Sequence, residues 1–428
     1  MKKQTAKGPK PKANGSQARA ADKFHLDDAE CQNCQRPTGG NSQQTKAKCQ
    51  QQIEIMFELL RSAVFDRDLV LEPSVNVDWD KLMSVSQEHG LLAWVWDGIC
   101  KLPKEQQPDR LTRIGWAVSA QELWDSYDNQ VSVLDEIVEK CGEKGIRVLL
   151  LKGICLSQLY PKPQSRPSCD IDIYPFERCF EVVEFLTDGN ANYGGKHFMF
   201  QYHGEHIECH DCIIDTVTPL QQNALNYLIS TFDDCEQSLN GYYVLPLLSN
   251  TIFVLIHILA HLNNPGPDPL RIRSILDYGM LLIKIQEQGK TTEFNELLST
   301  LELEHASDLF VRLSEWILQV NLSTYYSEAH ASTNDVEKAK ELLFNENLRH
   351  PIFDEKSFWK QLFQRIAQER AIRWRYSYLP SLERLRLSGK IRLQFSILVK
   401  SLLGLTFAVP LSKSIKEKRG GRSEKKQT

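Results

Sequence analysis

The chain has 428 residues with ordinary apolar and charged content, enough for two or three domains or for one large domain with appendages. Polar residues rather than an apolar core follow Met1-Lys2-Lys3, so we expect no secretory signal and a cytoplasmic location. Eleven cysteines in such a chain indicate reduced thiols and exclude a disulfide framework.

The net charge of −4 is distributed unevenly along the chain. Residues 1–48 contain ten lysines and arginines against four acidic residues, and residues 413–428 contain seven against two. Basic ends on an acidic body are typical of solvated tails rather than of a nucleic-acid surface. Phe24 is the only aromatic residue of the first segment, which therefore cannot bury enough apolar surface to become ordered. We expect a disordered basic tail at residues 1–48 and a second basic tail at 409–428.

An N-terminal helical region is predicted for residues 50–145. Apolar residues recur at three- and four-residue steps from Ile53 onward, as an amphipathic helix requires. A second helix begins with the acidic residues at 78–80, which suit the positive end of a helix dipole, and runs towards Gly90, a common residue at the end of a helix. A third, largely buried helix is expected at 91–99, and a long fourth helix at 110–142.

A short apolar run at residues 148–151 is closed by Lys152 and Gly153. This pattern predicts a buried strand that leads through a turn into a helix at 154–159. The first amides of that helix would face phosphate, with the ammonium of Lys152 as a point charge beside them. Lys152, Gly153 and the nearby Arg166 are therefore candidate phosphate-binding residues.

Three carboxylates follow at spacings that suit a metal site. Side chains alternate faces along a strand, so Asp170 and Asp172 point the same way, as do Glu208 and His210. Two carboxylates on one face repel each other unless a cation lies between them, and hard oxygen ligands suit Mg²⁺ or Mn²⁺. An isolated Asp-x-Asp pair is common by chance, so the prediction depends on the whole set. Asp170, Asp172 and Glu208 on neighbouring strands would form a site of the kind used in two-metal phosphoryl or nucleotidyl transfer.

The predicted fold class is α+β, with a small mixed sheet at residues 146–216 between the N-terminal helices and a larger C-terminal helical region. The order within this core is strand, helix, strand, helix and hairpin. Apolar residues with a helical period predict the second helix at 176–186. Residues 196–203 and 206–214 alternate around a two-residue turn at Gly204-Glu205, which predicts the hairpin.

Four short motifs together resemble one protein superfamily. They are Leu-Lys-Gly at 151–153, Tyr-Pro at 160–161, Arg-Pro-x-x-Asp-Ile-Asp-Ile at 166–173 and Glu-x-His at 208–210. This combination resembles the nucleotidyltransferase superfamily, which has the DNA polymerase β-like fold. More narrowly, it is similar to a bacterial group of uncharacterised nucleotidyltransferase-like proteins.

The resemblance assigns roles position by position. Asp170 and Asp172 match the paired metal ligands of the superfamily, and Glu208 matches its third carboxylate. Arg166 and His210 match residues typical of the narrower group, and His210 is expected near the substrate. The three carboxylates are thus both the catalytic residues and the metal ligands that the resemblance implies.

The resemblance implies an enzyme that uses Mg²⁺ or Mn²⁺ to transfer a nucleotidyl group from a nucleoside triphosphate to an acceptor. The acceptor stays open among small molecules, peptides and proteins, because one fold serves many substrates. The superfamily usually has a Gly-Ser or Gly-Gly turn where this chain has Lys152-Gly153. This departure supports an alternative, a degenerate module of the same fold that binds a nucleotide or a partner protein without turnover. A metal-dependent phosphoesterase is a third class, which usually has more histidines at its metals.

The C-terminal region, residues 217–408, is predicted to be helical. His257 and His261 lie one turn apart on a strongly apolar helix, where a zinc-binding pair and a hydrogen-bonded pair in the core are alternatives. The narrower group has a helix that carries histidine, followed by an arginine and an aspartate. Here these match Arg273 (or Arg271) and Asp277, which the resemblance places near the substrate together with both histidines. A buried pair of this arginine with Asp277 would either close over the metal site or form a structural salt bridge.

The last part of the chain offers two further alternatives. Residues 358–378 are aromatic and basic, which suits nucleic-acid binding but equally suits packing against a helical bundle, so nucleic acid is a disfavoured partner. Residues 391–411 contain an apolar run that is too short and too charged to span a membrane. A peripheral membrane contact beside the basic tail is the alternative for this run.

Two Cys-x-x-Cys pairs have half of a zinc-site spacing, Cys31 with Cys34 and Cys209 with Cys212. A structural zinc ion needs four ligands, and these pairs lie in different contexts, a polar tail and a predicted strand. Positions three apart in a strand face opposite sides, so we expect no shared metal at Cys209 and Cys212.

Overall fold

The computed structural model describes seven stretches of the chain, residues 42–73, 75–194, 197–214, 219–263, 270–326, 331–345 and 373–378. The chain divides into two compact units, residues 1–54 and 55–428. The described part of the first unit is the beginning of helix α1 (Ser42–Val64), and all other elements belong to the second unit. Most of both basic tails, most of the aromatic and basic segment, and the apolar run at 391–411 lie outside the described residues.

The helices predicted before residue 145 are present, and their ends have the expected caps. The carboxylate of Asp78 accepts a hydrogen bond from the amide of Lys81 at the start of α2, and Gly90 closes this helix in the left-handed conformation. Helix α1 begins at Ser42, inside the segment expected to be disordered, because the glutamines, lysines and alanine that follow favour a helix. The bounds of the next three helices are α2 (Trp79–His89), α3 (Leu92–Lys101) and α4 (Arg110–Glu143).

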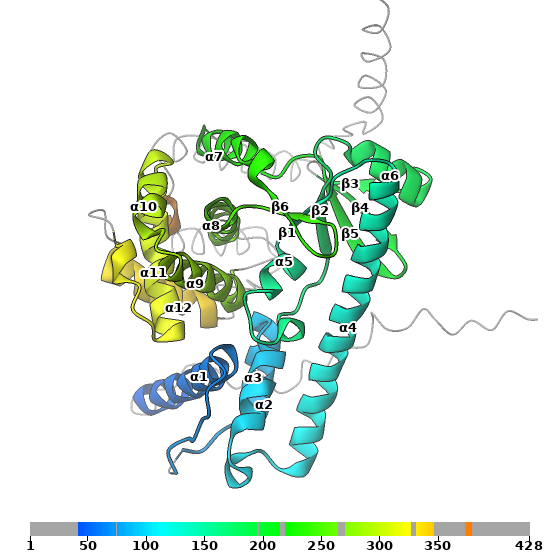
Figure 1. Ribbon diagram of the computed structural model, residues 1–428. Helices are drawn as coiled ribbons and strands as arrows, with labels where there is room; N and C mark the ends of the chain where they lie inside the picture. Colours follow the sequence, from blue (N-terminus) through cyan, green and yellow to red (C-terminus); the bar gives the residue numbers. More distant parts are fainter. Residues whose placement is uncertain are drawn as a thin grey trace, which may run out of the picture. The chain divides into compact units, whose positions relative to one another are not determined.

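Among the described residues, seven strands form one mixed sheet in the order β3-β4-β5-β2-β1-β7-β6 (Figure 1). Strand β1 pairs antiparallel with β2, and β2 pairs parallel with β5 so that Asp172 lies opposite Glu208. The α+β fold class predicted from the sequence is confirmed. The strands are β1 (Leu149–Leu151), β2 (Ile171–Tyr174), β3 (Asn192–Tyr193), β4 (His197–Tyr202), β5 (Glu205–His210), β6 (Glu236–Gln237) and β7 (Tyr243–Val244).

Strands β6 and β7 lie in a stretch that was expected to be helical, and that expectation is wrong. A turn at Gly241, with φ 89°, separates the two short strands, and the residues after it are tyrosines and a valine, which favour extended backbone. Strand β7 pairs parallel with β1, and the amide of Tyr243 donates to the carbonyl of Val148 at 2.7 Å. The sheet therefore draws strands from beyond the predicted core at residues 146–216.

The turn of the β4–β5 hairpin lies one residue earlier than predicted. Tyr202 pairs with Glu205, so the two turn residues are His203 and Gly204. Their φ angles of 49° and 88° are both positive, as the tight turns that join antiparallel strands require. Histidine tolerates the left-handed conformation better than most residues, whereas Glu205 continues the strand.

Two helices of the core are shorter than predicted. Helix α5 (Gly153–Ser157) is a single turn before Tyr160, and α6 (Cys179–Thr187) begins three residues after the expected start at residue 176. Phe176 and Glu177 have φ angles of 44° and 72°, which a right-handed helix cannot contain, so α6 can start only after them.

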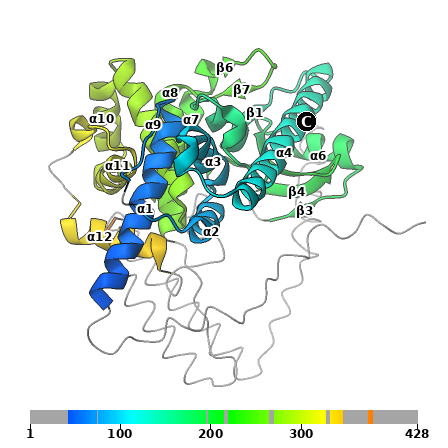
Figure 2. The same cartoon turned by 90° about the horizontal axis from the view of Figure 1, so that it is seen from below.

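One face of the sheet is buried against two helices. Ile171 and Ile173 of β2 and Cys209 of β5 lie in an apolar cluster with residues of α4 and α6. Figure 2 shows α4 and α6 beside the sheet. Because side chains alternate along a strand, Asp172 and Glu208 must project from the opposite face. The apolar residues of each strand thus fix which face carries the carboxylates.

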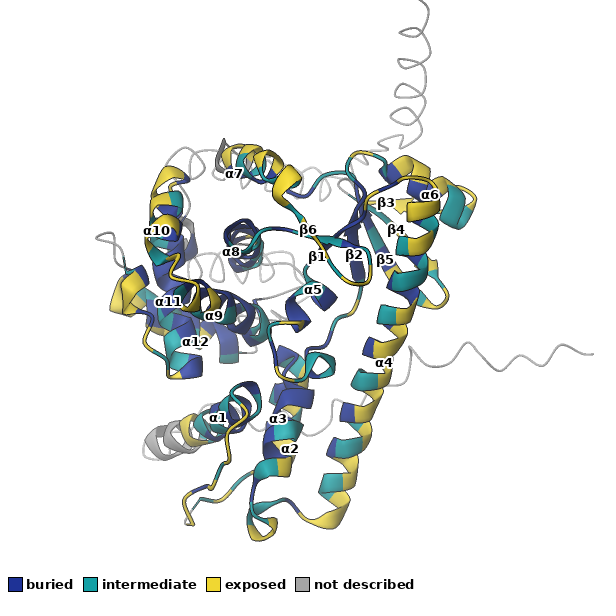
Figure 3. Cartoon of the chain, viewed as in Figure 1, coloured by how far each residue is buried: buried dark blue, intermediate teal, exposed yellow. Residues whose placement is uncertain are grey.

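The remaining helices follow β5 in the chain. Helices α8 and α9 are mostly buried, whereas α4 carries an exposed stripe along its length (Figure 3). Within the described stretches, every helix is too short or too polar to cross a lipid bilayer. The helices are α7 (Pro219–Ser230), α8 (Leu247–Asn263), α9 (Ile272–Glu287), α10 (Thr291–Thr300), α11 (Glu304–Leu318) and α12 (Thr333–Phe344).

Candidate active site

The structure brings the three predicted carboxylates together. Ligand oxygens of Asp170, Asp172 and Glu208 all lie within 4.8 Å of one another. Asp172 and Glu208 are register partners on the parallel strands β2 and β5, and Asp170 directly precedes β2. Because three like charges at this spacing repel one another, the group needs positive charge close by.

Two side chains of the protein supply that charge at Asp172, which is 2% exposed. The Nζ atom of Lys152 and the Nε2 atom of His210 each lie 2.9 Å from its Oδ1 atom. Burial alone would raise the pKa of Asp172, but Lys152 and His210 outweigh burial and hold this pKa well below its usual range. Asp172 is therefore an ionised carboxylate with a fixed orientation.

Lys152 reaches the carboxylates from a strained backbone position. It precedes α5 with φ 46°, a value that is uncommon for a residue with a β-carbon and costs on the order of 1–3 kcal/mol. Burial would lower the pKa of its ammonium, but the charges of Asp172, Asp170 and Glu208 outweigh burial and raise this pKa. Lys152 was predicted to face phosphate, and in the structure its charge lies among the carboxylates.

Asp170 has the opposite electrostatic environment to Asp172. It is half-buried, and the ion pairs of Asp172 with Lys152 and His210 have no counterpart at Asp170 among the described contacts. Burial and then the negative charge of Asp172 raise the pKa of Asp170 to about 6. A cation bound between the two carboxylates would offset this repulsion and favour the ionised form of Asp170.

Gly153 allows the Lys152 turn to approach the loop that carries Asp170. Its φ angle is 37°, and a β-carbon at this position would lie 2.8 Å from the Oγ atom of Ser168. That hydroxyl in turn donates to the carbonyl of Asp170 at 2.9 Å. A side chain at residue 153 would therefore push against the loop that positions the first carboxylate.

We expect Gly153→Ala to lower the free energy of unfolding by about 1–3 kcal/mol, because it combines a positive φ with a steric clash. Urea denaturation measures this loss. Gly115→Ala is the matched control, since a β-carbon there meets nothing within 4 Å on α4, and it should stabilise the protein by about 0.5–1 kcal/mol. Equal stability of Gly153→Ala and the wild type would contradict this description of the turn.

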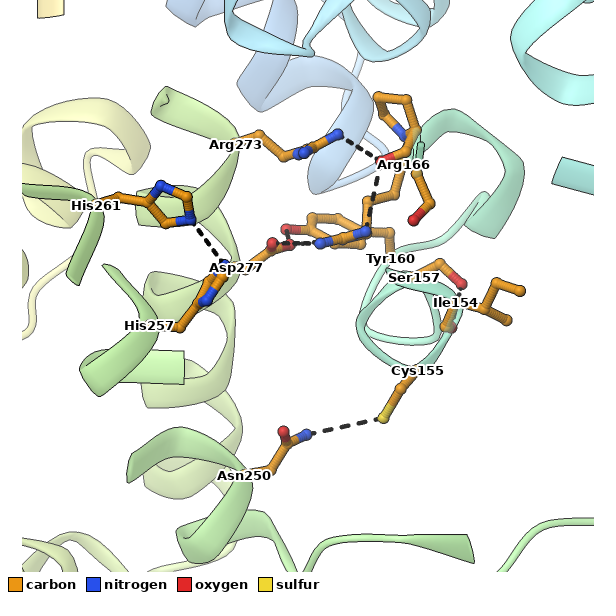
Figure 4. A network of polar contacts seen from close by, with 12 residues as sticks. Ile154, Cys155, Ser157, Tyr160, Arg166, Asn250, His257, His261, Arg273 and Asp277 are labelled. Atoms are coloured by element: carbon orange, nitrogen blue, oxygen red, sulfur yellow. Dashed lines mark hydrogen bonds and ion pairs between the residues drawn. The ribbon is translucent and has the colours of Figure 1, made fainter. Parts of the chain in front are cut away.

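Arg166 fixes the same loop to the C-terminal helices. Its Nε and Nη2 atoms donate to the two carboxylate oxygens of Asp277 on α9 at 3.0 and 2.7 Å, and Tyr160 donates to the same carboxylate at 2.8 Å (Figure 4). Arg166 and Asp277 are buried. The sequence predicted a buried Arg–Asp pair with Arg271 or Arg273 as the arginine, and that expectation is wrong because Arg166 takes this place. Its charge is matched by Asp277, so the geometry favours a positioning role over direct contact with phosphate.

Arg273 holds the loop from a second direction. Its Nη1 atom donates to the carbonyl of Pro167 at 2.7 Å, and Nη1 of Arg166 lies 3.4 Å from the same oxygen. Two arginines thus converge on the residue that begins the path from Arg166 to Asp170. These contacts make α9 a support for the carboxylate loop.

The two histidines of α8 lie one turn apart as predicted. The Nε2 atoms of His257 and His261 are 3.1 Å apart, and Figure 4 draws them with the Arg166–Asp277 pair. Both side chains are half-buried. Within the described part of the chain, neither belongs to a group of three metal-ligating atoms. Their predicted place near the substrate stays a prediction.

His197 was missed by the sequence analysis. It lies opposite His210 in the β4–β5 hairpin, and its Nε2 atom is 3.6 Å from Oε1 of Glu208. With the turn predicted at Gly204-Glu205, His197 would pair with a residue beyond His210. The signal was therefore present in the alternation of the strand, and a turn misplaced by one residue hid it.

One comparison with known proteins identifies a related family. Residues 76–319, more than half of the chain, match the family model described as uncharacterised nucleotidyltransferase. The match spans every residue of the carboxylate site and the helices α8 and α9 that support it. No curated protein and no solved structure matches the chain.

Proposed function

The chain belongs to the uncharacterised nucleotidyltransferase family, and on this premise we propose that it transfers a nucleotidyl group from a nucleoside triphosphate to an acceptor, with Mg²⁺ or Mn²⁺ as cofactor. The observation that carries the proposal is the convergence of Asp170, Asp172 and Glu208 on one sheet face, with the ammonium of Lys152 beside them. Family membership supports the reaction class, and the carboxylates support its dependence on a metal.

The donor set fits a hard divalent cation. All three groups offer carboxylate oxygens, which Mg²⁺ and Mn²⁺ prefer. Burial and then the negative charge of Asp172 raise the pKa of Asp170, and a bound cation would favour the ionised form of this carboxylate. Bound at Asp170, Asp172 and Glu208, divalent cations would supply neutralisation of the triphosphate charge and polarisation of the reacting oxygens.

Residues of the chain itself would orient the carboxylates, neutralise phosphate charge and accept a proton. Asp172 is held by Lys152 and His210, so its oxygens are oriented before any ligand arrives. The Lys152 ammonium would also lower the cost of bringing a triphosphate close to three carboxylates. Glu208 is 22% exposed, more than Asp172, and would accept the proton of an acceptor hydroxyl. Arg166 would keep the Asp170 loop in place from α9.

The affinity for the cation should depend on pH through Asp170. A proton and a cation compete for this carboxylate, whose pKa is raised to about 6 in the metal-free chain. The affinity for the cation should therefore reach its maximum above about pH 7. It should decrease as the pH drops through 6, with a slope that approaches a tenfold loss of affinity per pH unit for a single competing proton. Calorimetric titration with Mn²⁺ between pH 5 and 8 measures this. Affinity that stays constant over this range would contradict the assignment of Asp170 as a ligand.

Calorimetry with each nucleoside triphosphate tests the function itself. We expect one triphosphate to bind in the presence of Mg²⁺ or Mn²⁺ and to bind far more weakly when the cation is chelated. The nucleotide that binds then becomes the donor for an acceptor search, with release of pyrophosphate as the readout. Absence of binding for all triphosphates would overturn the proposal.

The ion pair of Lys152 with Asp172 favours one alternative, a module of the same fold without turnover. The superfamily usually has a small residue where Lys152 stands, and here its ammonium already neutralises Asp172 without a metal. A degenerate module that binds a nucleotide or a partner protein without turnover would have this property. Triphosphate binding that is unaffected by chelation of divalent cations would support this alternative over metal-dependent transfer.

A further inference from the structure

A second set of metal-ligating side chains adjoins the carboxylate site. Ligand atoms of His197, Glu208 and His210 all lie within 4.8 Å of one another. The Nε2 atoms of the two histidines are each 3.6 Å from a different oxygen of Glu208. Nitrogens and oxygens that share a small metal ion lie at about this separation, because each is about 2.0–2.2 Å from the ion.

The β4–β5 hairpin holds these three side chains in place through its register. Glu208 and His210 are two residues apart on β5 and share a face, and His197 is the register partner of His210 on β4. The rings of His197 and His210 have centroids 5.1 Å apart. A β-carbon at Gly194 would lie only 3.2 Å from Nε2 of His197, so the backbone closely confines the imidazole ring. Two paired strands of the sheet thus position all three donors.

The chemistry of this set differs from that of the carboxylates. Two imidazole nitrogens and one carboxylate suit Zn²⁺ and its first-row neighbours, whereas Mg²⁺ prefers an all-oxygen site. We propose that His197, Glu208 and His210 form a second cation site, which takes a transition-metal ion such as Zn²⁺ and shares Glu208 with the carboxylate site. Three protein ligands leave a coordination position open, so the ion could accept a water molecule or a substrate oxygen.

Glu208 and His210 connect the two sites. Nε2 of His210 lies 2.9 Å from Oδ1 of Asp172, so an ion bound at this nitrogen would replace the proton that the two groups share in the metal-free chain. The second site rests on the proposed function in one respect, because Glu208 would be a ligand in both sites. His197 belongs to the second site alone, so substitution of His197 tests the second site separately from the carboxylate site.

Cobalt(II) absorption tests the second site without an activity assay. The metal-free protein is titrated with Co²⁺ in excess Mg²⁺, and visible absorption reports an ion bound by nitrogen ligands. We expect one Co²⁺ per chain, displaced by Zn²⁺ but not by Mg²⁺. His197→Gln should weaken this binding by at least about 100-fold, because even the loss of an outer-shell partner typically costs 10–100-fold in affinity. His206→Gln is the matched control, since His206 is exposed on the same strand and face.

Two further variants keep the outcomes distinct. His197→Cys should restore Co²⁺ binding with a thiolate charge-transfer band absent from the wild type, which would place residue 197 at the ion. Asp170→Asn should lose Mg²⁺-dependent triphosphate binding but keep the Co²⁺ absorption.

The outcomes distinguish the two proposals. If the wild type binds Co²⁺ but no triphosphate, only the proposed function is overturned. Equal Co²⁺ affinity of His197→Gln and the wild type would overturn the second site, as would Co²⁺ binding lost in Asp170→Asn but kept in His197→Gln.

Discussion

Asp170→Asn is expected to weaken metal-dependent binding of a nucleoside triphosphate by at least about 100-fold while leaving the protein as stable as the wild type. The loss follows because the amide removes one of three carboxylate ligands, and loss of a ligand should cost at least as much as the 10–100-fold that is typical when a side chain that only orients a ligand is lost. Stability should persist because the ionised form of Asp170 is already disfavoured by burial and by the charge of Asp172. Calorimetry with Mn²⁺ and the triphosphate measures the first effect, and thermal unfolding measures the second.

Two matched variants show whether the effect belongs to the site. Asp188→Asn removes an exposed carboxylate at the end of α6, where asparagine tolerates the left-handed backbone, so binding and stability should be unchanged. Asp172→Asn should lose metal-dependent binding and also stability, by about 1–3 kcal/mol, because it removes the closest partner of the Lys152 ammonium, whose side chain is 17% exposed. Full triphosphate affinity in Asp170→Asn would show that the carboxylates do not hold the cofactor.

Arg166→Met is expected to lower the free energy of unfolding by about 3–5 kcal/mol. The substitution leaves the carboxylate of Asp277, which is 2% exposed, without the two hydrogen bonds that Arg166 donates to it. Chemical denaturation measures this loss. The double variant Arg166→Met/Asp277→Leu should recover part of it, because a buried ion pair replaced by apolar groups is often close to neutral in stability.

An exposed ion pair provides the control for Arg166. Arg178, the residue before α6, donates two hydrogen bonds to Glu181 on α6, and the two side chains are 40% and 50% exposed, so Glu181→Gln should leave the free energy of unfolding close to that of the wild type. The Arg166 variants should also bind the triphosphate more weakly, because the loop that carries Asp170 loses its anchor on α9. Stability losses of equal size for Arg166→Met and Glu181→Gln would contradict the anchoring role.

Sequence patterns were most informative where local spacing determines geometry. Alternation along β2 and β5 placed Asp172 and Glu208 on one face, because the apolar neighbours of each must point into the core. The long helix α4 and the caps at Asp78 and Gly90 were likewise local signals. The carboxylate group and the α+β architecture could therefore be predicted from the printed chain.

Features that depend on contacts between distant segments could not be predicted in this way. The partner of Asp277 is Arg166, more than a hundred residues earlier, and nothing local distinguishes it from Arg271 or Arg273. Strand β7 is two residues long and exists because it pairs with β1, so its own propensity was too weak a signal. His197 was hidden by a turn that is shifted by one residue, which moves every pair across the hairpin.

Anomalous diffraction from crystals grown with Mn²⁺ and a non-hydrolysable triphosphate would locate the cation itself. We expect an anomalous peak between Asp170, Asp172 and Glu208, with carboxylate oxygens about 2.1 Å away and the triphosphate on the open side. An ordered nucleotide without a peak there, with Lys152 still paired to Asp172, would contradict metal-dependent transfer. That result would assign the fold to nucleotide binding without turnover.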